Sequence, residues 1–179
     1  AGANVAEASA TIPQKWDKTV NVVIIGSGGA GLATAVSAAE NGVKDILVLE
    51  KLAFLGGNTA IATGAFNTAD PKQKEQGIED SPELHAQQTL KGGDFRANPE
   101  LVNELSHNSY DTLTWLESKG VKFQPKILQV YGALWPRSHA TAASKGSDYI
   151  RVLSEEAKKL GVTIQTQAKV VDIIRENQL

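Results

Sequence analysis

The fold is decided by one stretch, Val22-Val23-Ile24-Ile25-Gly26-Ser27-Gly28-Gly29-Ala30-Gly31. Four β-branched residues precede a cluster of glycines, and an alanine-rich run over Gly29–Glu40 follows it. A second apolar run, Ile46-Leu47-Val48-Leu49, ends in Glu50. A buried strand, a glycine turn, a helix and a second strand that ends in an acid are typical of a dinucleotide-binding βαβ unit. We therefore predict an α/β, Rossmann-like fold in which helices flank a parallel sheet.

The residue types in this unit each have a predicted role. Gly26 permits a sharp turn, Gly28 lets backbone N–H groups approach a pyrophosphate, and Gly31 lets the helix pack close to the strand. The helix that begins near Gly29 presents unpaired N–H groups and its positive dipole end to the phosphates. Glu50 can accept hydrogen bonds from a ribose diol, and its charge argues against a 2′-phosphate. These residues alone leave NAD and FAD open.

A second motif follows the acid. Lys51 comes next, and Gly56-Gly57-Asn58-Thr59 then leads into a run of small residues that reaches Gly64. With this motif the chain resembles the FAD-binding domain of the fumarate reductase and flavocytochrome c group, which includes urocanate and other enoate reductases. The resemblance runs from about Thr19 to the last residue and favours FAD as the cofactor.

The resemblance implies specific contacts with FAD. Ala30 would meet the pyrophosphate, Glu50 the ribose, and the backbone of Val170 the adenine. The small-residue segment, with Asn58, Thr59, Thr63 and Gly64, would lie along the flavin. The complete predicted cofactor-binding set is Gly26, Gly28, Gly29, Ala30, Gly31, Glu50, Lys51, Gly57, Asn58, Thr59, Thr63, Gly64 and Val170. We predict no metal site and no catalytic residue within the chain.

One segment departs from the family pattern. The predicted loop Trp135-Pro136-Arg137-Ser138-His139 resembles the family's Arg-x-His segment, but Ala140 to Ser144 replace the usual Arg-Pro-Thr-Gly-Gly. This difference leaves room for a different acceptor. Arg137 and His139 have two possible roles: hydrogen bonds that anchor the following helix, which we favour, or contact with flavin or substrate.

The remaining chain predicts further elements. Residues 68–80 read as a polar loop. Two helices begin at Ser81-Pro82 and Asn98-Pro99, where a capping residue precedes a proline, and they end at Gly92-Gly93 and Gly120. A third helix begins at Gly146-Ser147-Asp148, ends at Gly161 and turns Ile150, Leu153, Ala157 and Leu160 inward. Strands are predicted over Val162–Gln167 and Lys169–Arg175, before a polar hairpin turn at Glu176-Asn177-Gln178.

The composition of the chain argues against some classes of binding partner and bears on its cellular compartment. The net charge of −2 offers no basic face, which argues against nucleic acid. No apolar run approaches the length of a membrane span. The chain has no Cys, which excludes disulfides and Cys-ligated clusters or haem. The absence of Met suggests a start further upstream. We expect a periplasmic protein, or otherwise a cytoplasmic one.

The family's substrate motifs, His-Pro-Thr and Thr-Glu-x-x-Arg, do not occur in the sequence. We therefore expect a leader or linker over residues 1–18 and the amino-terminal part of an FAD-binding domain over 19–179, with the capping domain and the rest of the FAD domain elsewhere. The resemblance implies hydride transfer from reduced FAD to the C=C bond of an unsaturated carboxylate such as fumarate or urocanate. A haem or flavin domain would supply the electrons. Two alternatives are an FAD-dependent dehydrogenase or oxidase that works in the opposite direction, and a non-catalytic nucleotide-binding subunit.

Overall fold

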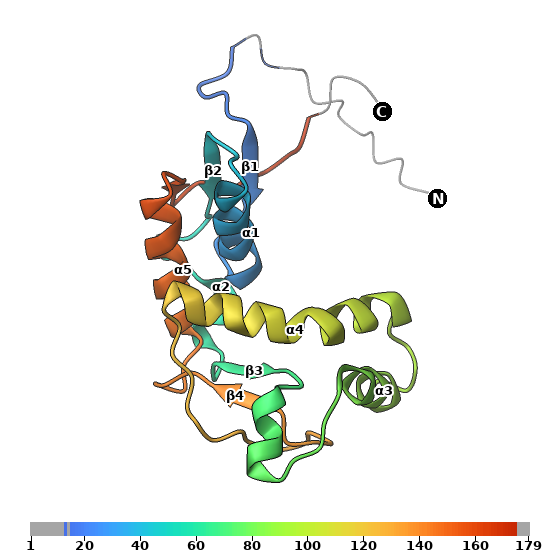
Figure 1. The fold of residues 1–179 in the computed structure, drawn as a ribbon. Helices are drawn as coiled ribbons and strands as arrows, with labels where there is room; N and C mark the ends of the chain where they lie inside the picture. The colour runs from blue at the N-terminus through green and yellow to red at the C-terminus, as the bar shows by residue number, and fades with distance from the viewer. Residues whose placement is uncertain (1–12, 14, 175–179) are drawn as a thin grey trace, which may run out of the picture.

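The computed structural model describes residues 13 and 15–174 (Figure 1). Strand β1 (Val22–Ile25), helix α1 (Gly29–Glu40) and strand β2 (Ile46–Leu49) follow one another as the sequence predicts. β1 pairs in parallel with β2, and β2 pairs in parallel with β5 (Thr163–Gln165), so the strand order is β1-β2-β5. The predicted α/β fold with a parallel sheet is confirmed.

The main core lies between this sheet and two helices, α1 and α5 (Ser147–Lys159), which pack against each other. Leu32 and Val36 of α1 are fully buried, as is Val48 of β2. Side chains alternate between the two faces of a strand, so Ile24 is buried whereas Val23 and Ile25 are 51% and 55% exposed. The sheet is therefore covered on the face that Ile24 occupies.

A second part of the molecule lies beyond α4, the long helix that crosses the middle of Figure 1. It contains the two-stranded antiparallel sheet of β3 and β4, in which Phe66 pairs with His139. The remaining elements are α2 (Gly57–Ile61), β3 (Ala65–Asn67), the 3-10 helix η1 (Pro71–Gln76), α3 (Pro82–Gly92), α4 (Pro99–Lys119) and β4 (Ser138–Ala140). No helix in the described part of the chain combines the length and apolarity that a membrane crossing requires.

The proline-led helix starts behave as predicted. Ser81 Oγ accepts the N–H of Leu84 at 3.1 Å, and Asn98 Oδ1 accepts the N–H of Glu100 at 2.8 Å. In α5, Ile150, Leu153 and Ala157 are buried. Leu160 was expected to point inward but caps the helix and is 37% exposed, because the chain already turns there toward Gly161.

Residues 68–80 are not the simple loop that their polarity suggests. Pro71–Gln76 form the 3-10 helix η1, which begins with a capping box: Asp70 Oδ1 accepts the N–H of Lys72, and Gln73 Oε1 accepts the N–H of Asp70. Gly77, in a left-handed conformation, ends it. The Asp-Pro pair is the same start signal as in the two longer helices.

Two other predictions were wrong. The expected loop at 135–139 contributes Ser138 and His139 to β4, because β3 offers its backbone as a partner. Lys169–Ile174 form no strand. After β5 the backbone turns at Gln167, with a φ of 56°, and no strand among the described residues pairs with the following segment. Arg175 and the predicted hairpin turn at 176–178 lie outside the described residues.

Candidate functional site

The glycine turn between β1 and α1 has the geometry that the sequence requires. Gly26 has a φ of +96°, a conformation that L side chains rarely adopt, and its N–H donates to the Leu49 carbonyl at 2.8 Å. A Cβ at Gly31 would lie 2.0 Å from the Gly26 carbonyl oxygen. A Cβ at Gly28 would approach nothing closer than the Gly56 oxygen at 3.8 Å. Gly31 therefore permits helix–turn packing, whereas Gly28 leaves open space.

The first turn of α1 has backbone N–H groups that can donate further hydrogen bonds. The Gly29 N–H donates to Thr59 Oγ1 at 3.1 Å. Among the described residues, no acceptor takes the N–H of Ala30 or of Gly31. Such free amides at the N-terminus of a twelve-residue helix, beside the open space at Gly28, suit a phosphate group.

Glu50 is the buried acid at the end of β2, with an exposure of 6%. Its Oε2 accepts the Ser27 hydroxyl at 2.6 Å and the Ser27 N–H at 3.0 Å, and its Oε1 accepts the Leu52 N–H at 2.9 Å. The Ser27 hydroxyl, then the Leu52 and Ser27 amides, hold the pKa of Glu50 below its usual 4.5. A carboxylate offers about four lone-pair sites, so one further donor can bind at Oε1.

Ser27 is a residue of this site that the sequence argument did not single out. It is fully buried, and its hydroxyl also accepts the Gly56 N–H at 3.3 Å. Parallel strands place their carboxyl ends at one edge of the sheet, so a hydroxyl after β1 and an acid after β2 could have been expected to meet. That signal was present in the sequence.

The segment after Glu50 returns to the glycine turn. Gly28 and Gly56 form an isolated parallel bridge, and α2 begins directly after it. A Cβ at Gly29 would lie 3.1 Å from Thr59 Oγ1, so the two segments are in close contact. The predicted residues Gly57, Asn58 and Thr59 thus lie on α2, beside the first turn of α1.

The end of this segment is fixed by the loop before α5 and by the first turn of α5. The Gly64 carbonyl accepts the N–H of Thr141 at 3.1 Å and the hydroxyl of Tyr149 at 2.9 Å. Burial, followed by the nearby charge of Asp148, raises the pKa of Tyr149, so its hydroxyl remains a donor. A Cβ at Gly146 would lie 1.9 Å from the Thr59 oxygen. Thr141, which belongs to the segment that departs from the family pattern, therefore helps to hold Gly64 in place.

Four other residues of the predicted cofactor-binding set are Lys51, Asn58, Thr63 and Val170. Lys51, Asn58 and Thr63 are exposed, whereas Val170 is half-buried. The chain that leads to Val170 passes beside Glu50, since the Ala168 N–H donates to the Glu50 carbonyl at 2.8 Å. The structure thus brings the glycine turn, Glu50 and α2 together.

Arg137 and His139 lie in a separate buried cluster. The Arg137 guanidinium binds both carboxylate oxygens of Asp80, at 2.8 and 2.7 Å, and both side chains are almost fully buried. His139 Nε2 lies 3.2 Å from Asp70 Oδ2, and its Nδ1 lies 3.0 Å from the Arg137 carbonyl. Gln73 Nε2 joins the two halves by donating to Asp80. These contacts support the anchoring role, here directed at the start of η1 and at Asp80, just before α3, rather than at the following helix.

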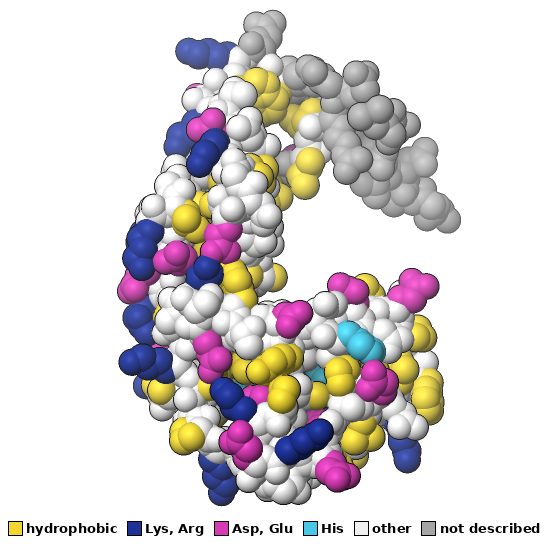
Figure 2. Space-filling view, viewed as in Figure 1, with side chains coloured by type: hydrophobic (Ala, Val, Ile, Leu, Met, Phe, Trp, Pro, Cys, Tyr) yellow, Lys and Arg dark blue, Asp and Glu magenta, His cyan; other side chains and the backbone are white. Residues whose placement is uncertain are grey.

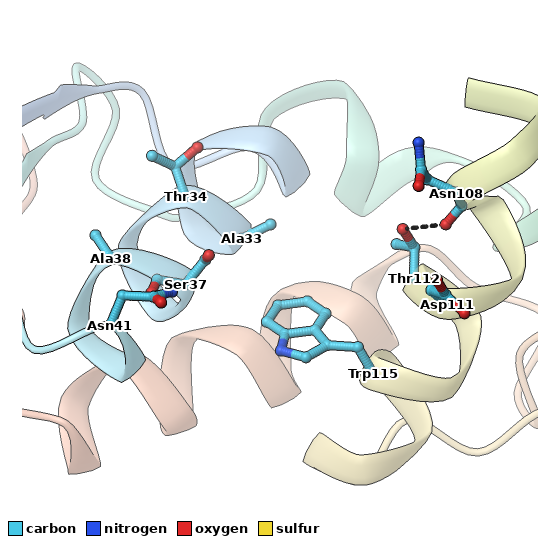
Figure 3. A pocket seen from close by; sticks show the side chains of 9 residues that line it. All are labelled: Ala33, Thr34, Ser37, Ala38, Asn41, Asn108, Asp111, Thr112 and Trp115. Carbon is cyan, nitrogen blue, oxygen red and sulfur yellow. Dashed lines mark hydrogen bonds between the residues drawn. The ribbon is translucent and has the colours of Figure 1, made fainter. Parts of the chain in front are cut away.

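A different hollow lies between the two parts of the molecule, and Figure 2 shows it on one side of the surface. Part of it is a cavity of about 650 Å³ between α1 and α4, drawn in Figure 3. The Trp115 indole extends from α4 toward the small residues of α1, and its Nε1 donates to Glu40 at 2.9 Å. None of the predicted cofactor-binding residues lines this cavity.

The geometry at the carboxyl edge of β1 and β2 defines a dinucleotide-binding βαβ unit. Comparison with known proteins identifies its class, because the family model described as FAD binding domain matches residues 21–178. The chain belongs to this family, and its cofactor is FAD.

Individual proteins that are similar to this chain include two reductases and a dehydrogenase. The acrylate reductase flavoprotein subunit of Shewanella woodyi is 36% identical over 156 residues, which cover 87% of this chain and 31% of that protein. A flavocytochrome c3 fumarate reductase in an open conformation has a TM-score of 0.82 and 30% identity, over 88% of this chain and 28% of that one. The 3-ketosteroid-Δ4-(5α)-dehydrogenase of Rhodococcus jostii RHA1 also has a TM-score of 0.82, with 29% identity over 93% of this chain and 41% of that one. The chain thus spans under half the length of each.

Proposed function

We propose that this chain holds FAD for an oxidoreductase that reduces the C=C bond of an unsaturated carboxylate. The observation that supports FAD binding is the pair formed by the open first turn of α1 and the ionised, almost completely bonded Glu50. Sequence similarity to the acrylate reductase subunit and structural similarity to the fumarate reductase support the reaction class.

The residues present fit FAD at both ends of the site. The amides of Ala30 and Gly31 would donate to the pyrophosphate, and the open space at Gly28 would admit it. Glu50 Oε1 would accept one ribose hydroxyl. Asn58, Thr59, Thr63 and Gly64 would face the flavin, on a backbone that Tyr149 and Gly146 hold in place. Val170 would offer its backbone to the adenine, with Lys51 and Gly57 near the site.

When bound, FAD would supply the hydride, and the protein's task in this region is to hold and orient it. The groups that bind the substrate carboxylates would come from other parts of the same flavoprotein, since the chain spans 31% of the length of the acrylate reductase subunit. In this proposal residues 19–179 belong to the FAD-binding domain and 1–18 form a leader or linker. A haem or flavin domain would deliver electrons in the periplasm.

A second candidate is oxidation of a saturated substrate. The ketosteroid dehydrogenase has the same TM-score as the fumarate reductase, so the fold supports both directions. Nothing at the glycine turn or at Glu50 distinguishes them. The proposal of a reductase therefore depends on the relatives' reaction class rather than on the geometry of the FAD site.

Anaerobic reoxidation separates these candidates. The native flavoprotein that contains this sequence is reduced with dithionite, and its flavin absorption is followed after addition of fumarate, acrylate or urocanate. Rapid reoxidation by one of these acids is expected for a reductase, while a saturated carboxylate of similar size serves as the control. Stable reduced flavin with every unsaturated acid would contradict the proposed direction, and the absence of bound flavin would contradict the FAD site itself.

A further inference from the structure

We propose that Ser27 is a positioning residue that orients the Glu50 carboxylate toward the FAD ribose and couples it to the Gly56 turn. This inference rests on the proposed FAD site and adds a residue that neither the sequence motif nor the family resemblance assigns. Ser27 would not contact the cofactor through its side chain, because that side chain is fully buried and already engaged.

The hydrogen bonds of Ser27 link three segments. Its hydroxyl donates to Glu50 Oε2 at 2.6 Å and accepts the Gly56 N–H at 3.3 Å, and its own N–H donates to the same Oε2 at 3.0 Å. A hydroxyl has one hydrogen to donate, and that hydrogen is used on the carboxylate. The direction of the bonds is therefore fixed: the Gly56 N–H donates to Ser27, and Ser27 donates to Glu50.

This arrangement decides which oxygen of Glu50 is available. Oε2 receives two donors from Ser27, whereas Oε1 receives only the Leu52 N–H at 2.9 Å. Oε1 is consequently the oxygen that retains an open lone-pair site for a ribose hydroxyl. Without the Ser27 hydroxyl, Oε2 would lose its shortest bond, and the carboxylate could rotate away from this orientation.

Ser27 also favours the ionised form of Glu50. Its hydroxyl is the largest cause of the lowered pKa of Glu50, ahead of the Leu52 amide and the Ser27 amide, while burial opposes them. Lys51 is the charged residue of the described chain that also lowers this pKa. Removal of the hydroxyl should therefore raise the pKa of Glu50. Because the ionised form accepts the ribose, FAD affinity in the variant should begin to fall at a higher pH than in the wild type.

The test compares FAD dissociation constants of Ser27→Ala, Ser27→Cys and wild type, measured by quenching of flavin fluorescence from neutral pH to about pH 5. Ser27→Ala should bind roughly tenfold more weakly at neutral pH, since a hydrogen bond to a charged group is lost, and the ratio should grow as the pH falls. Ser27→Cys has a weaker donor, so its FAD affinity should lie between those of Ser27→Ala and the wild type. This variant also provides the test if Ser27→Ala does not fold. Ser37→Ala, at an exposed position on the helix α1 that follows the glycine turn, is the matched control.

A double-mutant cycle separates positioning from a general structural effect. In a Glu50→Gln background the Ser27→Ala change should cost much less FAD affinity, because the charged partner is already gone. Equal losses in both backgrounds, or a pH profile that Ser27→Ala and Ser27→Cys leave unchanged, would overturn the inference while the FAD site stands. Failure of the wild type to bind FAD would instead overturn the proposed function.

Discussion

The two polar regions of this chain differ in whether their charged groups and backbone amides are paired within the protein. At the β1–α1 turn, the Ala30 and Gly31 amides have no acceptor among the described residues, and Glu50 keeps one open site. In the cluster behind β4, by contrast, Arg137 binds both oxygens of Asp80, and both ring nitrogens of His139 have partners. The free amides and the open carboxylate site mark the first region as a ligand site, and the buried ion pair and the bonded imidazole mark the second as a support.

The Arg137–Asp80 pair should give the largest loss of stability. Arg137→Met would leave the Asp80 carboxylate, whose side chain is 1% exposed, without its cation, and we expect a loss of about 3–5 kcal/mol in the free energy of unfolding. Urea denaturation measures it. Adding Asp80→Asn should restore much of this loss, because the buried charge is removed together with its partner. Equal stability of the wild type and Arg137→Met would show that the pair is not buried as described.

Two glycine variants separate packing from binding at the open region. Gly31→Ala places a methyl 2.0 Å from a backbone oxygen and should cost about 3 kcal/mol of stability. Gly28→Ala has room for its methyl and an ordinary φ of −67°, so its stability should change little while FAD binding weakens. Thermal melting and FAD titration of both proteins provide the comparison. A Gly28→Ala protein with wild-type FAD affinity would argue against a pyrophosphate at this turn.

The acid should affect binding more than folding. Glu50→Gln keeps the side-chain shape but removes the charge that accepts the Ser27 and Leu52 hydrogens, so FAD affinity should fall roughly 10- to 100-fold. Isothermal titration of the purified proteins would show it. Glu40→Gln, which changes a surface acid paired with Lys119, is the control and should leave FAD affinity unchanged. Unchanged affinity in Glu50→Gln would remove the ribose assignment.

The smallest expected effect is at Tyr149. Tyr149→Phe removes one of two donors to the Gly64 carbonyl, and the Thr141 N–H remains, so stability should fall by only about 1 kcal/mol. If the Gly64 segment lies along the flavin, the visible spectrum of bound FAD should also shift slightly. Tyr110→Phe, on α4 and away from this segment, should produce neither change. A spectrum identical to wild type would place the flavin elsewhere.

The sequence predicted the open region well because its determinants are local. Gly26, Gly31 and the apolar run before them define a turn and a close helix contact, and Ser81-Pro82 and Asn98-Pro99 define helix starts without reference to the rest of the chain. The parallel pairing of β1 with β2 then follows from the helix that connects them.

What could not be predicted depends on partners far away in the sequence. The Arg137–Asp80 and His139–Asp70 pairs join residues 57 and 69 positions apart, and no local pattern announces them. β3 and β4 are three residues each and form because they pair with each other. Leu101 and Leu105 have the spacing of a buried helix face, yet they are 68% and 57% exposed near the start of α4. Ser27 differs from these cases, because its position and that of Glu50 at the carboxyl ends of adjacent parallel strands predict that they meet.

The most direct test of the central claim is a titration with FAD of the flavin-free form of the flavoprotein that contains this sequence, followed by quenching of flavin fluorescence, beside the same titration of Gly28→Val. We expect saturable binding of one FAD per wild-type chain and a large loss of affinity in the variant, because the valine side chain would occupy the space left for the pyrophosphate. No saturable binding to the wild type, or equal binding to both proteins, would contradict a cofactor site at the β1–α1 turn.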